Sequence, residues 1–161
     1  LADFAEALRA IRWMMGGLDV ASYVPIVAAL PFIVISFGAF AMMTRTLNLL
    51  SVGTEAAASR GVDIVRAQRV AFISASLATG AAVSLGGPIG FIGIIVPHLV
   101  RLMVGSDHRI VLPASALFGA AFLVLCDLAA RTLMSPLEIP VGVVTALLGG
   151  PFFLWLLVKR S

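Results

Sequence analysis

The sequence predicts an all-α, polytopic membrane protein, and three observations support that fold class. Of the 161 residues, 61% are hydrophobic and only 12% are charged, whereas a typical soluble domain is roughly 25% charged. Long stretches carry no charge, and basic residues gather at their ends. A charged side chain at the bilayer centre costs about 2.5–3.5 kcal/mol on insertion scales. We therefore expect one membrane domain, residues 1–161, with about five membrane-spanning helices.

Residues 1–22 have a mixed character and are predicted to face outward from the bilayer. Phe4, Leu8, Ile11 and Met15 recur at helical spacing among charged residues, which is typical of an amphipathic helix. Because the sequence does not begin with methionine, we expect a fragment of a longer chain. The segment is then either an amphipathic helix or the end of a truncated one.

Three apolar stretches predict spans at residues 23–43, 110–133 and 139–158. The first and third carry no charge, and the second is apolar from Ile110 to Cys126 and closes with Asp127 and Arg131. About 20 apolar residues are enough for a helix to cross the hydrocarbon core. Arg45 follows the first stretch and Lys159 follows the last. These basic residues are typical of the edges of membrane spans.

A longer uncharged stretch lies between Arg69 and Arg101. As a single helix it would be roughly 46 Å long, well beyond the core thickness of about 30 Å. Three glycines and a proline occur at residues 86–90, and this composition breaks helices. We therefore expect two helices, residues 65–86 and 89–104.

The basic residues test this arrangement through the positive-inside rule. With two helices in that stretch, the cytoplasmic side receives Arg45, Arg60, Arg66, Arg69, Arg101, Arg109, Lys159 and Arg160, and the outward side receives Arg9, Arg12 and Arg131. A single helix would instead move the later residues to opposite sides and remove the bias. The rule predicts cytoplasmic segments at residues 44–64, 105–109 and 159–161, and an outward loop at 134–138.

The segment 44–64 is the one substantial polar interval between spans. We expect Thr54 to cap a short helix, Glu55 to lie in its first turn, and Gly61 to end it in a left-handed conformation. Asp63 is expected to cap the following helix. Two interpretations remain open: a compact connector, or a rigid helix that docks in a groove of a peripheral partner.

Several motifs of this chain resemble those of the FecCD-type ABC transporter permeases. They are residues 87–101 (GPIGFIGIIVPHLVR), 105–109 (GSDHR), 127–131 (DLAAR), 138–146 (EIPVGVVTA) and 149–155 (GGPFFLW). Their order and separations match the family from about Trp13 to Arg160. The family's residues in the helix hairpin correspond to Gly87, Pro88, Gly90, Phe91, Gly93, Pro97, His98 and Arg101.

The resemblance implies a non-catalytic permease subunit, the carboxyl-terminal half of a ten-helix protein that imports iron-siderophore, haem or cobalamin across a bacterial or archaeal inner membrane. It implies four partners: a second permease subunit (a homo- or heterodimer), a cytoplasmic ABC ATPase dimer, a periplasmic or lipid-anchored substrate-binding protein, and the lipid bilayer. ATP and Mg²⁺ are then used by the ATPase, and this chain needs no cofactor and no nucleic acid.

The resemblance also assigns residues to two docking sites. Arg131 matches an arginine that pairs with a glutamate of the binding protein, although Asp127 offers a local partner four residues earlier. The family's ATPase-coupling loop corresponds to Leu47, Asn48, Leu49, Ser51, Gly53, Glu55, Ala56, Ala57, Arg60 and Gly61. The Ile-x-Leu-Pro ending of the longer importer pattern does not occur between Gly61 and Val70.

The residues leave two other classes of protein open. An ion-coupled secondary transporter usually places carboxylates deep in the membrane, whereas the acids here lie at span ends or in loops. An intramembrane enzyme could use a serine of an apolar stretch with His98 as base, but no Gly-x-Ser-x-Gly motif accompanies it. We expect His98 to pack between helices, and Cys126 to be a small buried apolar side chain with no disulfide partner.

Overall fold

The computed structural model describes residues 2–19, 22–132 and 139–160, without the side chains of residues 2–5, 9 and 160. Within these ranges it contains seven helices and no strand, which confirms the all-α fold class. The helices are α1 (Ala2–Met15), α2 (Tyr23–Val52), α3 (Thr54–Ala58), α4 (Ile64–Gly86), α5 (Ile92–Val104), α6 (His108–Thr132) and α7 (Val141–Arg160).

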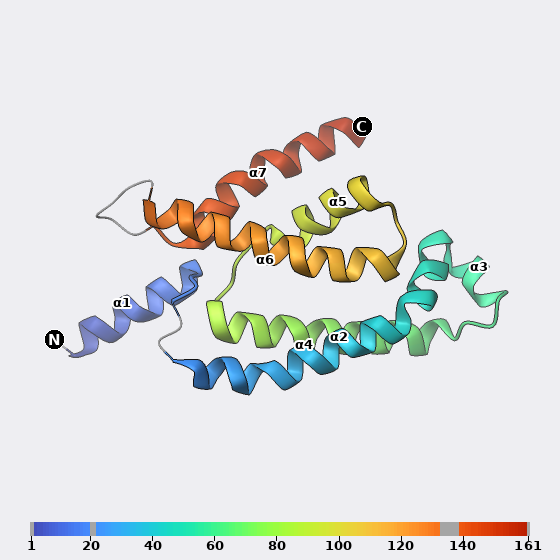
Figure 1. Ribbon diagram of the computed structural model, residues 1–161, viewed down its shortest axis with the longest axis horizontal. Helices are drawn as coiled ribbons and strands as arrows, with labels where there is room; N and C mark the ends of the chain where they lie inside the picture. The colour runs from blue at the N-terminus through green and yellow to red at the C-terminus, as the bar shows by residue number, and fades with distance from the viewer. Residues whose placement is uncertain (1, 20–21, 133–138, 161) are drawn as a thin grey trace.

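The helices form two groups (Figure 1). In the first, α2 and α4 pack along their length, and α3 connects them at one end. In the second, α6 packs against both α5 and α7, and α2 contacts α6 between the groups. We call the two ends of this bundle the α3 end and the α1 end (Figure 1).

Four helices, α2, α4, α6 and α7, are long and apolar enough to cross a membrane. The fifth predicted span, α5, is apolar but has only 13 residues, or roughly 20 Å at 1.5 Å per residue. It begins at Ile92 instead of residue 89, because residues 87–90 are not helical and Phe91 has a left-handed φ of 66°. The predicted break between α4 and α5 is therefore present and longer than expected.

Helix α2 continues beyond its predicted end at residue 43. Residues 44–52, expected in a loop, form its last turns, and the helix ends at Gly53. No glycine or proline occurs between Thr44 and Val52, so nothing in the backbone stops the helix there. The charge of Arg45 marks an edge of the apolar stretch but not the end of the helix.

The remaining boundaries differ by a few residues. Helix α6 begins at His108, inside the loop expected at 105–109. Helix α7 runs from Val141 to Arg160, so it begins after residue 139 and includes Lys159 and Arg160, which were expected in the tail. The expected outward loop, 134–138, lies outside the described residues.

Glycines bring three chain segments together at the α1 end. The Gly17 N–H donates to the Gly86 carbonyl at 2.9 Å, and the Gly142 N–H donates to the Gly16 carbonyl at 3.3 Å. A Cβ on Gly87 would collide with the Trp13 carbonyl. The ends of α1 and α4 and the start of α7 can therefore meet backbone to backbone only because side chains are absent.

The buried apolar core of the described residues is small. One cluster joins α5 to α6 through Val96, Val100 and Val111, and a second joins α6 to α7 around Cys126, Ala130 and Val141. Large apolar side chains are exposed on every long helix. Such a surface is typical of helices that contact lipid or further protein segments.

Candidate functional site

The short helix α3 lies between two glycines with positive φ, Gly53 (144°) and Gly61 (80°). The prediction that Thr54 caps α3 is wrong, because Gly53 occupies the N-cap position and no side chain bonds there. The predicted cap of α4 is confirmed: the Arg66 N–H donates to Asp63 Oδ1 at 3.0 Å. The left-handed conformation expected at Gly61 is also present.

One face of α3 is fixed against the rest of the chain. The Ala57 side chain is completely buried, and its backbone accepts from the Val62 N–H at 3.1 Å and donates to the Gly53 carbonyl at 3.0 Å. Glu55 and Arg60 are exposed, and Ala56 is half-buried. The small side chain of Ala57 therefore packs inside the chain and does not lie on the outer surface of α3.

The other predicted coupling residues are on α2. Leu47, Asn48 and Leu49 are half-buried in its last turns, and Ser51 is exposed. The Ser51 hydroxyl donates to the Asn48 carbonyl at 2.7 Å, which is a bond within the same helix. The predicted coupling loop is thus the end of α2, helix α3 and the turn to Gly61.

Asn48 makes contacts across the two groups of helices. Its Nδ2 donates to Asp107 Oδ1 at 2.7 Å. Its Oδ1 accepts from the His108 backbone N–H at 2.8 Å and lies 2.6 Å from His108 Nδ1. The partners are 59 and 60 residues away in sequence, so one side chain joins the end of α2 to the start of α6.

These contacts shift the acidity of Asp107. The Arg109 backbone N–H donates to Asp107 Oδ1 at 3.0 Å. This bond, and then the bond from Asn48, lower the pKa of the Asp107 carboxyl because hydrogen bonds stabilise its charged form. The carboxylate is therefore ionised at neutral pH, and it accepts from both neighbours.

The predicted hairpin residues divide between the connection and α5. Gly87, Pro88, Gly90 and Phe91 lie before the helix, and the aromatic ring of Phe91 fills the space beside Gly149 of α7.

Gly93, Pro97, His98 and Arg101 lie on α5. The His98 ring packs edge-on against Phe152 of α7, with centroids 5.9 Å apart. Arg101 Nη2 lies 3.5 Å from His108 Nε2. His98 is thus in the packing role expected for it, and Arg101 extends the Asn48 contacts at the α3 end.

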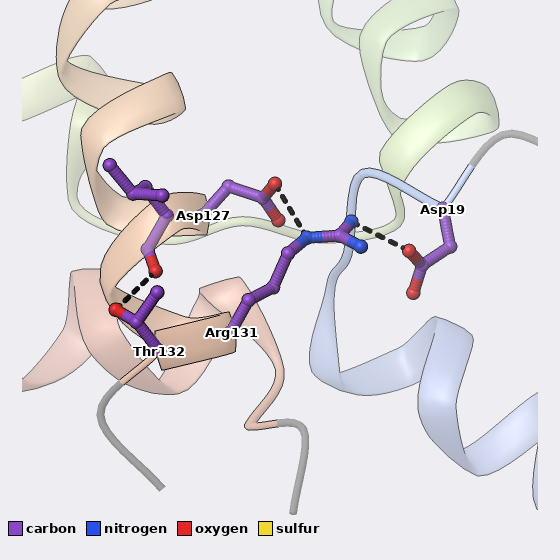
Figure 2. A network of polar contacts seen from close by, with 5 residues as sticks. Asp19, Asp127, Arg131 and Thr132 are labelled. Carbon is purple, nitrogen blue, oxygen red and sulfur yellow. Dashed lines mark hydrogen bonds and ion pairs between the residues drawn. The ribbon is translucent and has the colours of Figure 1, made fainter. Parts of the chain in front are cut away.

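At the opposite end, Arg131 is held by two carboxylates (Figure 2). Its Nε donates to Asp127 Oδ2 and its Nη2 donates to Asp19 Oδ1, each at 2.8 Å. The pair with Asp127 is the local alternative considered from the sequence. Asp19, 112 residues away, was not predicted, because no sequence spacing relates the start of α2 to the end of α6.

Basic residues separate between the two ends of the bundle. Helices and turns at the α3 end carry six exposed arginines: Arg45, Arg60, Arg66, Arg69, Arg101 and Arg109. Arg12 and Arg131 are exposed toward the α1 end. Six of the eight residues grouped by the two-helix arrangement therefore share one end of the molecule.

Two serines of the apolar stretches bond to the backbone of their own helices. Ser36 donates to the Phe32 carbonyl at 2.7 Å, and Ser84 donates to the Ala81 carbonyl at 2.8 Å. Both bonds stay within one helix, as is usual for serine in membrane helices. Neither places a histidine beside the hydroxyl.

Comparison with known proteins agrees with this geometry. The chain is 48% identical to a cobalamin import system permease protein of Halobacterium salinarum over 156 residues, which cover 97% of this chain and 42% of that protein. It is 43% identical to a hemin transport system permease protein of Yersinia pestis over 160 residues, covering 99% and 48% respectively. The chain spans less than half the length of these relatives.

A solved structure shares the fold. It is a metal-chelate type ABC transporter described in an inward-facing conformation, with a TM-score of 0.81 and 32% identity over 92% of this chain and 49% of that one. The model of the FecCD transport family matches residues 1–159. The chain belongs to the FecCD transport family, whose members are permease subunits of membrane transporters.

Proposed function

We propose that this chain is part of a permease subunit of an ATP-driven (ABC) importer that moves an iron chelate, haem or cobalamin across the inner membrane by alternating access. The observation that carries the proposal is the family match over residues 1–159. Relatives named for cobalamin, hemin and ferric dicitrate transport supply the substrate class. The subunit itself makes and breaks no bond.

The α3 end is the proposed contact with the ATPase dimer, which uses ATP and Mg²⁺. Helix α3 is short and lies between Gly53 and Gly61; Glu55 is exposed on the helix and Arg60 is exposed in the turn after it. ATP binding closes the ATPase dimer and displaces α3, and the long helices then rotate as rigid bodies. Each nucleotide state must favour one position of α3 through its own contacts. This assignment places the α3 end and the carboxyl terminus in the cytoplasm.

The α1 end is the proposed contact with a periplasmic or lipid-anchored binding protein. Arg131 keeps 45% of its side chain exposed while it pairs with Asp127 and Asp19. An arginine has five N–H donors, and two of them are used here, so a carboxylate of the partner can still bind. A second permease subunit, identical or not, completes the pathway.

Uptake into proteoliposomes tests the proposal. The complete subunit is reconstituted with its ATPase and binding protein, and hemin, cyanocobalamin and a ferric chelate are offered in turn. We expect uptake of one of them that requires ATP and stops when either partner is omitted. Uptake driven by a proton gradient without ATP would instead indicate an ion-coupled transporter, and chemical change of the solute would indicate an enzyme.

A further inference from the structure

We propose that Asn48 is a positioning residue that ties α3 and the end of α2 to the turn between α5 and α6, so that the two segments move as one unit. The inference rests on the proposed coupling role of α3. It adds the turn, residues 105–107, to the part of the subunit that responds to the ATPase.

The side-chain oxygen of Asn48 has two partners, one for each of its lone pairs. Oδ1 accepts from the His108 backbone N–H at 2.8 Å and faces His108 Nδ1 at 2.6 Å, and a carbonyl oxygen has two lone pairs. Because Oδ1 only accepts, His108 carries its proton on Nδ1. Its Nε2 is then an acceptor that faces Arg101 Nη2 at 3.5 Å, so every group in the contact has a compatible role.

Asn48 is placed where a displacement of α3 can be transmitted to it through the backbone of α2. It lies in the last turns of α2, and the helix continues to Val52, after which Gly53 leads directly into α3. A displacement of α3 therefore reaches Asn48 through a short stretch of hydrogen-bonded backbone. If a flexible linker separated α3 from Asn48, the linker would absorb this displacement.

The tie crosses the boundary between the two groups of helices. Apart from Asn48, the side-chain hydrogen bonds described at the α3 end join residues within one group. They include the Asp63 cap of α4 and the Arg109 contact of Asp107. Asn48 alone among the described side chains joins the groups there.

The packing of α5 against α6 allows a displacement of the turn at residues 105–107 to reach further helices. The turn connects α5 to α6, and these helices are packed together through Val96, Val100 and Val111, each at most 5% exposed. A shift of the turn therefore moves both helices, because a close-packed pair does not deform continuously. Through α6 the shift reaches α7, which packs against it.

Spin-label distances test the tie in the complete subunit. Exposed Ser59 beside α3 and exposed Ser106 in the turn are changed to cysteine in a C126A background, and labelled subunits are diluted with unlabelled ones. Distances are measured for the permease alone and for the complex with its ATPase, with and without ATP and vanadate. The variants are N48A, the reciprocal pair N48D/D107N, and T44A. Thr44 bonds only within its own helix and is the matched control.

We expect one narrow distance distribution in the parent and in T44A, unchanged by nucleotide. N48A should lose that single narrow distribution. N48D/D107N should recover most of it, because the amide introduced at position 107 donates to the carboxylate introduced at position 48, while the Arg109 N–H loses the oxygen that it bonds in the parent. An N48A distribution as narrow as the parent's would overturn the tie. So would a parent distance that shifts with ATP as far as that of N48A.

The two proposals fail in different ways. The measurement on the permease alone does not depend on the ATPase, so it reports on the tie even if the ATPase does not bind. Failure of the ATPase to bind would remove the proposed function and leave the tie standing. A complex that transports normally with N48A and keeps a narrow distribution would remove only the tie.

Discussion

At the residue scale, the arrangement around Arg131 gives this side chain two separate properties. Asp127 lies one turn away on the same helix, whereas Asp19 comes from the segment before α2, and both accept from the guanidinium at 2.8 Å. Exposed ion pairs are worth about 0.2–1 kcal/mol. The pairs therefore orient the arginine without contributing much to folding.

Replacing Arg131 with glutamine should separate docking from stability. We expect binding of the periplasmic partner to weaken about tenfold, or roughly 1.4 kcal/mol, because arginine contacts are frequent interface hot spots. The free energy of unfolding should change by less than about 1 kcal/mol. Binding is measured by surface plasmon resonance on the complete subunit in nanodiscs.

Arg12 provides the control for this experiment. It is exposed on α1 toward the same end, so R12Q removes an equal charge and leaves the ion pairs of Arg131 with Asp127 and Asp19 in place. Equal weakening by R12Q and R131Q would show that only the net charge of this end matters, and the specific role of Arg131 would be lost.

Asp107 makes the contacts of Asn48 depend on pH in a defined direction. Its pKa is lowered from 3.8 in the folded chain. Stability from its contacts is therefore present above that ordinary value and disappears as the pH falls through the lower folded value. Wild type should exceed D107N in thermal stability by a constant margin from about pH 7 to pH 5, and the margin should shrink below about pH 4. A margin that stays constant to about pH 3 would contradict this assignment.

At the element scale, the packing of α5 against α7 depends on one of two adjacent glycines. A Cβ on Gly149 would collide with Cβ and Cγ of Phe91, which is held at a φ of 66° at the start of α5. A Cβ on Gly150 would meet nothing within 4 Å. The two positions therefore form a matched pair within one turn of α7.

Gly149→Ala should destabilise the subunit by about 1–3 kcal/mol, the usual cost of overpacking, because the atoms nearest to the new methyl group lie close to the Phe91 backbone. Gly150→Ala should be neutral or slightly stabilising, since alanine favours helices by up to about 1 kcal/mol. Thermal unfolding in detergent gives both values. Equal stability of the two variants would show that Phe91 can move aside.

At the scale of the whole molecule, α2 and α6 have a polar tie at each end of their contact. Asn48 meets the start of α6 at the α3 end, and Asp19, just before α2, meets Arg131 near the other end of α6. The two helices run antiparallel (Figure 1). The proposed partner sites are therefore joined by one pair of helices.

This architecture predicts which residues share a compartment. Cysteines at Ser59 and Ser106 should react with a membrane-impermeant maleimide from one side of the membrane, and a cysteine at Ser22 should react from the other. All three positions are exposed, and Cys126 is buried. Labelling is compared in right-side-out and inside-out vesicles. Reaction of Ser59 and Ser106 positions from opposite sides would refute both the topology and the coupling proposal.

The sequence by itself determined the fold class, the family and most of the helices. Uncharged stretches of sufficient length specify helices in lipid, because every backbone group there must bond within its own segment. The break at residues 86–90, the cap at Asp63 and the left-handed Gly61 follow from local chemistry and were predictable. The end of α2 at Val52 was not predictable from charge, because charged residues mark the edge of the membrane whereas helix ends depend on residues that break the backbone pattern.

Only the tertiary structure decided which distant residues meet. The partners of Asn48 and Arg131 lie 59 to 112 residues away, and hydrogen-bond partners at that separation leave no periodic pattern in one sequence. The burial of Ala57 and the fit of Phe91 against Gly149 likewise depend on how helices approach each other. Local residue chemistry fixes each element, whereas the contacts between elements depend on the packing of the whole bundle.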